Sequence, residues 1–378
     1  MKIVFVIMDL DLGGGAEHDI VNLSSGLNAV GHTPVVITSG GRLCPMIESQ
    51  GIPVITCPVD RRSPTALWHN AQRIAEIAEA HGADVLNPQG LYPAVSCYRA
   101  SRRLLKRGRI VPNIVTIHML GRLKWWYYFL GTRILNLHAD HVIFESQCEL
   151  DRVRRQGLRR PFTVIPNCFP AGKIESVQES NADIRRDIGC PEDAVLFVMP
   201  ARMTPEKNHP LLFDALTCDR VRKLPVHFFL AGDGKLQEDY KTRVEQAGLQ
   251  KSVTFGGFRS DLPRLYKAAD VFLLCSLVES LPLSIREGMA ASLPVIATRV
   301  GGIPEAVEDG QSGILVPSGN ADALADAIVA LATDPDLRRS MGRRGHAIFR
   351  EKFDYDSWIA RTLEVMGQVH ERFKRAPR

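Results

Sequence analysis

The first half of the chain alternates short, continuous apolar runs with longer segments whose apolar residues recur at a helical period. Unbroken apolar runs are typical of buried parallel strands, and the amphipathic segments between them are typical of helices. Strands are predicted over residues 3–8, 33–38, 85–86, 114–117, 142–144 and 163–165. Helices are predicted over residues 16–30, 64–81 and 93–107. This alternation indicates a parallel sheet with helices on both faces.

The same pattern restarts near residue 195, and 378 residues are too many for one ordinary core, so two domains are predicted. Further strands are expected over residues 195–199, 227–231, 253–255, 271–274 and 295–297. Further helices are expected over residues 208–218, 235–248, 261–268, 283–291, 303–308 and 321–333. The segment 168–192 is the expected linker, which gives domains over residues 1–168 and 169–354. A last helix over residues 355–374 is predicted to complete the first domain.

The predicted fold class is therefore α/β, with two doubly wound, Rossmann-like domains facing a central cleft. In such sheets ligands bind at the carboxyl ends of the strands. The residues that carry the chemistry should therefore lie in the loops that lead from strand to helix.

Composition narrows the class of protein. The chain is 45% hydrophobic and 24% charged, as in globular proteins, and no apolar run is long enough to cross a membrane. The first apolar run is cut off by Asp9 and Asp11, so no signal peptide is predicted. The eight cysteines form no CxxC pair and no metal-ligand spacing. We therefore expect reduced thiols, no metal and a cytoplasmic location.

Charge is distributed unevenly. Residues 97–160 carry 14 Lys and Arg against 4 Asp and Glu, and this basic stretch contains an aromatic run over residues 124–129. Basic residues beside aromatic residues suit peripheral contact with an anionic membrane, on its inner face. A solvated helix face beside a buried aromatic helix explains the same pattern. No nucleic-acid recognition motif accompanies the charge, so a nucleic-acid partner is not expected.

The most informative segment runs from Glu279 to Glu287. Pro282 suits the first position of a helix, which would direct the N–H groups of residues 280–284 at the space between the two carboxylates. A helix N-terminus favours an anion, and carboxylates accept hydrogen bonds from hydroxyls. Phosphate together with hydroxyls describes a nucleotide sugar.

Other strand-to-helix loops supply further candidates. Arg202 and Lys207 follow one strand and suit a diphosphate, although Glu206 offers a local ion pair instead. His118 ends another strand, where it can donate to a substrate oxygen or be a structural histidine. Glycines that permit close approach to a ligand follow several strands: Gly13, Gly14, Gly15, Gly232, Gly234, Gly256, Gly257, Gly301 and Gly302.

The run from Phe255 through Ala327 resembles the second domain of the retaining glycosyltransferases of family 4, which have the GT-B fold. The resemblance rests on the two glutamates with their Gly-Met-Ala continuation, on Gly301-Gly302, and on Arg202 with Lys207-Asn-His. It extends more loosely into the first domain through the glycine loop at 13–15 and His118. Ser280 and Leu281 stand where the family pattern has glycine and an aromatic residue, and Asn167-Cys168 replaces an Asn-Gly turn.

The resemblance implies a role for each matching position. Arg202 and Lys207 would hold the donor diphosphate, and Glu287 would bind the ribose. Glu279 would bind sugar hydroxyls, and His118 would contact the transferred sugar. The remaining substrate-binding positions are Gly14, Gly15, Gly232, Gly257, Ser280, Leu281, Pro282 and Leu283.

We therefore predict a retaining, metal-independent hexosyltransferase that uses a nucleotide diphosphate sugar as donor and needs no cofactor. Its acceptor would be a glycan or a lipid-linked sugar in the biosynthesis of cell-surface polysaccharide or glycolipid. Two alternatives share the predicted features: a nucleotide-sugar epimerase of the same fold and a non-catalytic sugar-nucleotide-binding protein. A nicotinamide dehydrogenase is disfavoured because the GxGxxG spacing is absent.

Overall fold

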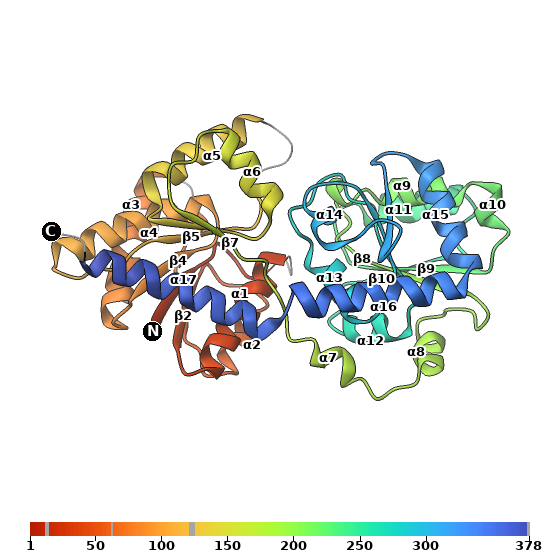
Figure 1. The fold of residues 1–378 in the computed structure, drawn as a ribbon, viewed down its shortest axis with the longest axis horizontal. Coiled ribbons are helices and arrows are strands. Elements are labelled where there is room, and N and C mark those ends of the chain that lie inside the picture. Colours follow the sequence, from red (N-terminus) through yellow and green to blue (C-terminus); the bar gives the residue numbers. More distant parts are fainter. Residues whose placement is uncertain (12–14, 62, 121–124, 376–378) are drawn as a thin grey trace. The chain divides into compact units, whose positions relative to one another are not determined.

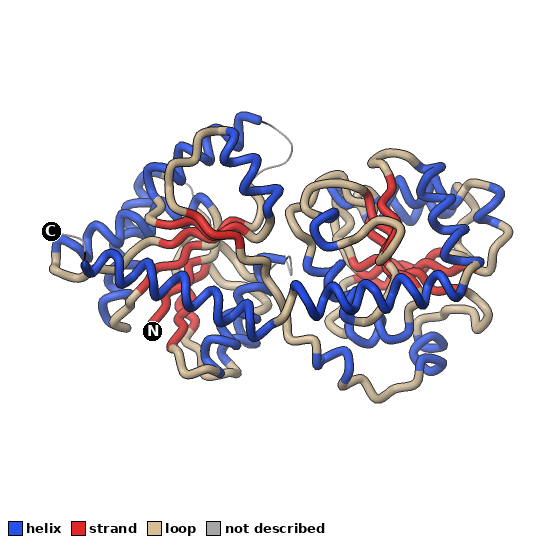
Figure 2. Tube along the Cα trace, in the orientation of Figure 1, coloured by secondary structure: helices blue, strands red, loops and turns tan. Residues whose placement is uncertain are grey.

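The computed structural model describes residues 1–11, 15–61, 63–120 and 125–375. The chain divides into two compact units (Figure 1). Unit 1 comprises Met1–Phe169 together with Tyr355–Arg378, and unit 2 comprises Pro170–Asp354. Each unit has parallel strands at its centre and helices outside them (Figure 2).

Seven parallel strands form the centre of unit 1. They are β1 (Lys2–Val6), β2 (Thr33–Thr38), β3 (Val54–Thr56), β4 (Val85–Pro88), β5 (Ile114–Ile117), β6 (His141–Phe144) and β7 (Phe162–Val164). One sheet has the order β3-β2-β1-β4 and a second has the order β5-β6-β7. Isolated parallel bridges, Leu86 to Asn113 and Gln89 to Thr116, join β4 to β5. The carboxyl ends of β4, β5 and β6 are therefore neighbours.

The helices of unit 1 pack in two groups, which lie on opposite faces of the strands (Figure 1). One group packs in chain order and consists of α3 (Pro64–Ala80), α4 (Leu91–Lys106), α5 (Trp125–His138) and α6 (Gln147–Arg155). The other consists of α1 (Gly15–Ala29), α2 (Cys44–Glu48) and α17 (Tyr355–Arg375). Apolar side chains of the strands fill the core between the groups, as the continuous apolar runs predict.

Helix α17 belongs to unit 1 although it follows unit 2 in the chain. The Tyr355 hydroxyl donates a hydrogen bond to the carbonyl oxygen of Asn22 at 2.7 Å. Ile359 is buried against Gly26, where a larger residue on α1 would collide with it. The Arg361 guanidinium donates to the carbonyl oxygen of Val164 at 3.2 Å. These contacts attach α17 to α1 and to the end of β7.

Unit 2 is built on one six-stranded parallel sheet in the order β10-β9-β8-β11-β12-β13. Its strands are β8 (Val195–Pro200), β9 (Val226–Ala231), β10 (Val253–Gly257), β11 (Val271–Leu274), β12 (Val295–Thr298) and β13 (Gly313–Val316). The order doubles back at β8, since the chain adds strands first on one side of it and then on the other. This reversal is the feature that places ligand sites at the carboxyl ends of strands in open α/β sheets.

Helices again pack in separate groups. On one side lie α9 (His209–Leu216), α10 (Asp219–Arg222), α11 (Gln237–Gln246) and α15 (Ala321–Thr333). The other group is formed by α8 (Asn181–Asp187), α12 (Leu262–Ala268), α13 (Leu283–Ala290) and α16 (Pro335–Lys352). Three short elements complete the unit: α7 (Gly172–Glu175), the 3-10 helix η1 (Pro205–Lys207) and α14 (Ile303–Ala306).

The structure contains elements that the apolar pattern does not predict. Strands β3 and β13 are short strands at the edges of their sheets; β3 is only partly buried, whereas β13 is a four-residue, mostly buried strand. Helix α16 is rich in charge and contains Gly342 and Gly345, which suggest a break in a helix. Gly342 instead lets α16 approach the backbone of Ser292, because a Cβ there would overlap the Ser292 carbonyl oxygen.

Candidate functional site

The carboxylate of Glu279 is the centre of a polar cluster in unit 2, in the loop after β11. The Lys207 ammonium, at the end of η1, lies 2.5 Å from Glu279 Oε1. The Ser276 hydroxyl donates to the same oxygen at 2.6 Å. Glu279 is 7% exposed, so its charge is compensated by these two donors in a largely buried setting. The structure thus brings together two predicted residues, Lys207 and Glu279, as a direct ion pair.

The backbone around Glu279 is fixed by close packing. Gly301 has a φ of +56°, and a Cβ at this position would overlap the Glu279 carbonyl oxygen. The N–H of Gly302 donates to the carbonyl oxygen of Ser280 at 2.6 Å. The side chain of Arg286, which is fully buried, donates to the carbonyl oxygen of Leu281 at 3.0 Å. Gly301 and Gly302 therefore contact the backbone of the loop that carries Glu279, and they help to position this loop.

Helix α13 begins at Leu283, the start of the predicted range 283–291, although Pro282 is expected to be its first residue. Pro282 has a φ of −65° and a ψ of 126°, so it is the residue that precedes the helix, and Leu283 is the first helical residue. The first N–H groups of a helix have no partner within it. Because α13 starts between the two glutamates, its N-terminus still presents N–H groups and the positive end of its dipole to this segment.

Glu287 is held by a tyrosine from the neighbouring helix. The Tyr266 hydroxyl, on α12, donates to Glu287 Oε2 at 2.6 Å. Burial, together with the charge of Glu287, raises the pKa of Tyr266 well above its ordinary value. The phenol therefore remains a hydrogen-bond donor and fixes the orientation of the carboxylate.

The loop after β8 carries Arg202 and is packed against the loop after β9. A Cβ at Gly232 would overlap the carbonyl oxygen of Ala201, so this glycine permits the close approach of the two loops. The N–H of Met203 donates to the carbonyl oxygen of Asp233 at 2.7 Å. Among the residues that the structure describes, no carboxylate pairs with the Arg202 guanidinium. Arg202 therefore differs from Lys207, which is already paired.

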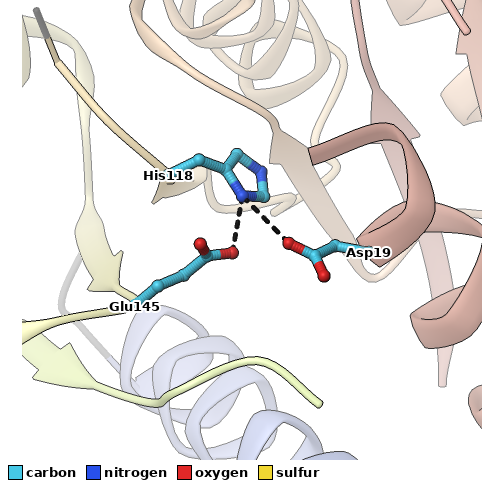
Figure 3. A group of neighbouring side chains, drawn as sticks. All are labelled: Asp19, His118 and Glu145. Carbon is cyan, nitrogen blue, oxygen red and sulfur yellow. Dashed lines mark ion pairs between the residues drawn. The ribbon is translucent and has the colours of Figure 1, made fainter. Parts of the chain in front are cut away.

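A second polar cluster lies in unit 1 and is centred on His118 (Figure 3). His118 Nδ1 lies 2.5 Å from Glu145 Oε1 and 3.3 Å from Asp19 Oδ2. His118 Nε2 lies 2.8 Å from Gln89 Oε1. A hydrogen bond from the Asn167 amide also reaches Asp19 Oδ2. The cluster lines a small cavity whose apolar wall includes Trp358 of α17.

Local structure explains why these side chains converge. Gln89, His118 and Glu145 each follow a strand, and their strands β4, β5 and β6 are neighbours. After Glu145, Ser146 caps α6 by accepting a hydrogen bond from the N–H of Glu149 at 3.2 Å. The Glu149 carboxylate in turn accepts the N–H of Leu120 at 2.6 Å, which fixes the loop beyond His118.

The electrostatics of the cluster favour a charged histidine. Burial alone would lower the pKa of His118, but the charges of Glu145 and Asp19 and their hydrogen bonds outweigh it and raise this pKa to about 10. Burial raises the pKa of Asp19, the charge of Glu145 raises it further, and His118 opposes both.

Sequence reasoning named His118 but missed its partners Asp19, Gln89 and Glu145. A usable signal was present, because a polar residue directly follows each of three apolar strands that neighbour one another.

Of the predicted glycines, Gly257 lies at an irregularity between β10 and β9, and Gly15 begins α1. Gly14 lies outside the described residues, so its contact with a donor diphosphate stays a prediction.

The comparison with known proteins agrees with this geometry. Residues 13–171 match the family model described as Glycosyltransferase Family 4, and residues 180–347 match the model described as Glycosyl transferases group 1. EpsD of Bacillus subtilis, which is named as a glycosyltransferase, is 26% identical over 352 residues, or 89% of this chain and 88% of EpsD.

Two further relatives are informative. The UDP-Gal:alpha-D-GlcNAc-diphosphoundecaprenol alpha-1,3-galactosyltransferase of Escherichia coli is 29% identical over 228 residues, which is 57% of this chain and 55% of that enzyme. The crystal structure of Anabaena HepE in complex with UDP and glucose is 23% identical and superposes with a TM-score of 0.84. This superposition covers 97% of this chain and 100% of HepE.

The fold and its structural neighbours define the class of architecture, two Rossmann-like domains of the GT-B type. The two family models, which lie in separate halves of the chain, then give the particular family: the chain belongs to the family 4-like glycosyltransferases. The predicted fold class and the predicted glycosyl transfer activity are thus confirmed, and glycosyl transfer is supported over the epimerase and the non-catalytic binding protein.

Proposed function

We propose that this enzyme transfers a sugar from a nucleotide diphosphate sugar to a hydroxyl of a glycan or lipid-linked acceptor, with retention at the anomeric carbon and without a divalent metal. HepE was crystallised in complex with UDP and glucose, and the E. coli relative is named for its action on a diphosphoundecaprenol-linked sugar. The observation that carries the proposal in this chain is the cluster of Arg202, Lys207, Glu279 and the start of α13 in unit 2.

The donor diphosphate needs positive charge, and three groups of unit 2 supply it. Arg202 has no carboxylate partner among the described residues, so its guanidinium is available to phosphate oxygens. Lys207 contributes a second cation, and the N-terminus of α13 contributes N–H groups and dipole. Preorganised donors of this kind stabilise the charge that develops on a leaving group. They do for the diphosphate what a divalent metal does in other enzymes.

The two glutamates suit the hydroxyl groups of the donor. Glu279 Oε1 is occupied by Lys207 and Ser276, and this fixes the plane in which its second oxygen accepts hydrogen bonds. Glu287 Oε2 is fixed in the same way by Tyr266. Glu279 would accept from sugar hydroxyls and Glu287 from the ribose, as the family resemblance implies.

The state of Glu279 bears on the route by which retention, which the family resemblance implies, would be reached. A carboxylate that is held by a lysine and a serine is a weak nucleophile, so a covalent glycosyl intermediate on Glu279 is disfavoured. Attack on the face that the leaving group vacates is the remaining route to retention. The bond from the anomeric carbon to the diphosphate oxygen breaks, the bond to the acceptor oxygen forms, and the acceptor proton passes to the departing phosphate.

A transfer assay tests this proposal. The protein is incubated with UDP-, GDP- and ADP-sugars and a polyprenyl-diphosphate-linked sugar, with EDTA or with magnesium. We expect one donor to be consumed with acceptor-dependent release of nucleoside diphosphate, at the same rate in EDTA. Proton NMR of the product should show the anomeric configuration of the donor. Inversion, or a requirement for magnesium, would contradict the corresponding part of the proposal.

We further propose that α5 docks this enzyme on the inner face of an anionic membrane. In α5 the exposed apolar side chains Trp126, Leu130 and Leu137, together with Arg133, repeat at a helical period. Trp125 beside them is 70% exposed, and the Arg133 guanidinium lies 4.5 Å from the Phe129 ring centre. Exposed aromatic residues beside arginine are typical of interfacial helices. Lys124, the first residue of the predicted aromatic run, lies outside the described residues.

No helix in the part of the chain that the structure describes is long and apolar enough to cross a membrane. Vesicle sedimentation tests the docking proposal with phosphatidylglycerol and phosphatidylcholine liposomes. The variant Trp126→Ser/Leu130→Ser should lose about tenfold or more in affinity for the anionic vesicles, because two large apolar side chains no longer insert. Trp68→Ser, which removes an exposed tryptophan from α3, is the matched control. Unchanged binding of the α5 variant would exclude α5 as the docking surface.

A further inference from the structure

The cluster around His118 contains two carboxylates and one imidazole from three separate elements of unit 1 (Figure 3). The carboxylates of Asp19 and Glu145 are almost fully buried, with side chains 4% and 7% exposed. The His118 side chain is 17% exposed, so it is the most accessible member of the cluster. Its protonation state decides what it can offer to a ligand.

A chain of amide hydrogen bonds fixes the proton on one ring nitrogen. The Asn87 amide nitrogen donates to the Ile114 carbonyl oxygen at 2.6 Å and to the Thr116 hydroxyl at 3.0 Å. Asn87 Oδ1 therefore accepts, and it does so from the Gln89 amide nitrogen at 2.7 Å. This leaves Gln89 Oε1, an acceptor, facing His118 Nε2 at 2.8 Å. The Nε2 atom must consequently carry a hydrogen.

The other ring nitrogen faces only acceptors in this cluster. Nδ1 lies 2.5 Å from a Glu145 oxygen and 3.3 Å from an Asp19 oxygen. A bare nitrogen lone pair 2.5 Å from a carboxylate oxygen would be repelled by it, whereas a protonated nitrogen forms an ion pair with it. Both nitrogens are then protonated, and the raised pKa of His118 agrees with this geometry.

We propose that Asp19 and Glu145 are positioning residues that keep His118 as an imidazolium, so that it serves glycosyl transfer as a fixed cation and Nε2–H donor and not as a general base. This inference deepens the proposed function and rests on it. The Nε2–H bonds to Gln89 in this structure, and an oxygen of the donor or acceptor can take the place of the amide oxygen. A histidine that is always charged cannot accept the acceptor proton, which agrees with transfer of that proton to the leaving phosphate.

The same three side chains resemble a metal site, since their ligand atoms lie within 4.8 Å of one another. The hydrogen bonds argue against this use. Nδ1 lies at ion-pair distance from Glu145, and Asp19 Oδ2 already accepts a hydrogen bond from Asn167. A metal would need the imidazole to lose a proton and would have to displace these partners. The NMR experiment described below can therefore also detect a metal bound to these side chains.

The groups that face His118 come from several elements of unit 1. Asp19 comes from α1, Gln89 from the end of β4, Glu145 from the end of β6, and Trp358 and Thr362 from α17. Among the described residues that line this cavity, the two carboxylates are the only other titratable groups. A change in the titration of His118 can therefore be traced to Asp19 and Glu145.

Nitrogen-15 NMR of the histidine side chains measures the protonation state directly, without any substrate. Spectra of wild type and His118→Gln assign the signal, and a titration from pH 5.5 to 9.5 follows it. We expect both nitrogens of His118 to stay protonated through this range in the wild type. In Glu145→Gln the pKa of His118 should fall by about two units, since one close opposite charge is removed. Asp19→Asn should give a shift in the same direction.

Glu79→Gln is the matched control, because Glu79 is a surface carboxylate of unit 1 that pairs with Arg107. It should leave the His118 signal unchanged. A wild-type His118 with one bare nitrogen would overturn the proposal, as would an unchanged His118 titration in Glu145→Gln. One equivalent of zinc in the purified protein, with ring nitrogen signals typical of metal ligation, would overturn it in favour of the metal site.

The second readout is the pH dependence of kcat. Glu145→Gln should approach wild-type kcat at low pH and lose activity as the pH rises through the lowered pKa of His118. A uniform loss at every pH would indicate a merely structural role and would contradict the proposal. A wild-type kcat that rises with a pKa near neutrality would identify a general base instead. If no nucleotide sugar is consumed at all, the proposed function fails, and the NMR titration still decides the state of His118.

Discussion

The two polar clusters of this enzyme balance their charges differently. In unit 2 the cation Lys207 is paired with one carboxylate, Glu279, and Glu287 has a neutral partner in Tyr266. In unit 1 the single cation His118 is shared between two carboxylates, Asp19 and Glu145. A one-to-one pair can exchange its partner for a phosphate. Burial and the charge of Glu145 raise the pKa of Asp19 to about 7, and the two carboxylates together favour the charged form of His118. The first cluster is therefore suited to an anionic ligand and the second to presenting a positive charge.

The largest effect should come from breaking the pair in unit 2. Lys207→Met removes a cation that the proposed donor site uses, so kcat should fall by about 10²–10³. It also leaves Glu279 Oε1 with the Ser276 hydroxyl and without its cation, which should lower the free energy of unfolding by about 1–3 kcal/mol. Steady-state kinetics and urea denaturation measure the two quantities.

A double variant separates the two effects. Lys207→Met/Glu279→Gln should recover much of the lost stability, because the uncompensated charge is gone, but not the activity. Lys223→Met, which removes an exposed lysine from the same unit, is the control and should behave as wild type. Normal turnover in Lys207→Met would show that the Lys207–Glu279 pair has only a structural role. The proposed difference between the two clusters would then be wrong.

A smaller effect is expected from the neutral partner in unit 2. Tyr266→Phe removes the hydroxyl that fixes Glu287, and hydrogen bonds to charged groups contribute about 1.5–3 kcal/mol. The affinity for the nucleoside diphosphate should fall by about tenfold, with little change in kcat at saturating donor. Calorimetric titration gives the affinity, and Tyr240→Phe on α11 serves as the control. Equal affinities for Tyr266→Phe and wild type would remove Glu287 from the ribose role.

The smallest effect probes the dependence of unit 1 on α17. Ile359→Val trims a buried contact with Gly26 and should cost about 1 kcal/mol of stability. All four tryptophans belong to unit 1, so tryptophan fluorescence follows the unfolding of this unit. The control Ile328→Val makes the same change in a buried position of α15 in unit 2. If both variants shift the fluorescence transition equally, the units unfold together and cannot be compared separately.

Sequence reasoning succeeded best where one short segment carries the chemistry. Glu279, Pro282 and Glu287 lie within nine consecutive positions, so local rules alone place both carboxylates at a helix start. The error of one residue at Pro282 arises because proline tolerates both the position before a helix and its first turn. The pairing of Lys207 with Glu279 could not be predicted, since it depends on how the loops after β8 and β11 pack.

Prediction failed where function is assembled from distant parts of the chain. Asp19 and Glu145 are far apart in sequence and meet because α1 and β6 lead to the same end of the unit. A single buried carboxylate carries no local signature. Strand order is required to see that Gln89, His118 and Glu145 are neighbours, and the apolar pattern gives strands without giving their order.

The path of the chain has a consequence for how the enzyme is made. Synthesis leaves unit 1 at Phe169, produces the whole of unit 2, and only then supplies α17, whose Trp358 and Thr362 line the His118 cavity. Domains generally fold as units during synthesis. On the ribosome, unit 2, which carries Glu279 and Glu287, can therefore fold completely first. Unit 1 cannot complete its packing until α17 has been translated.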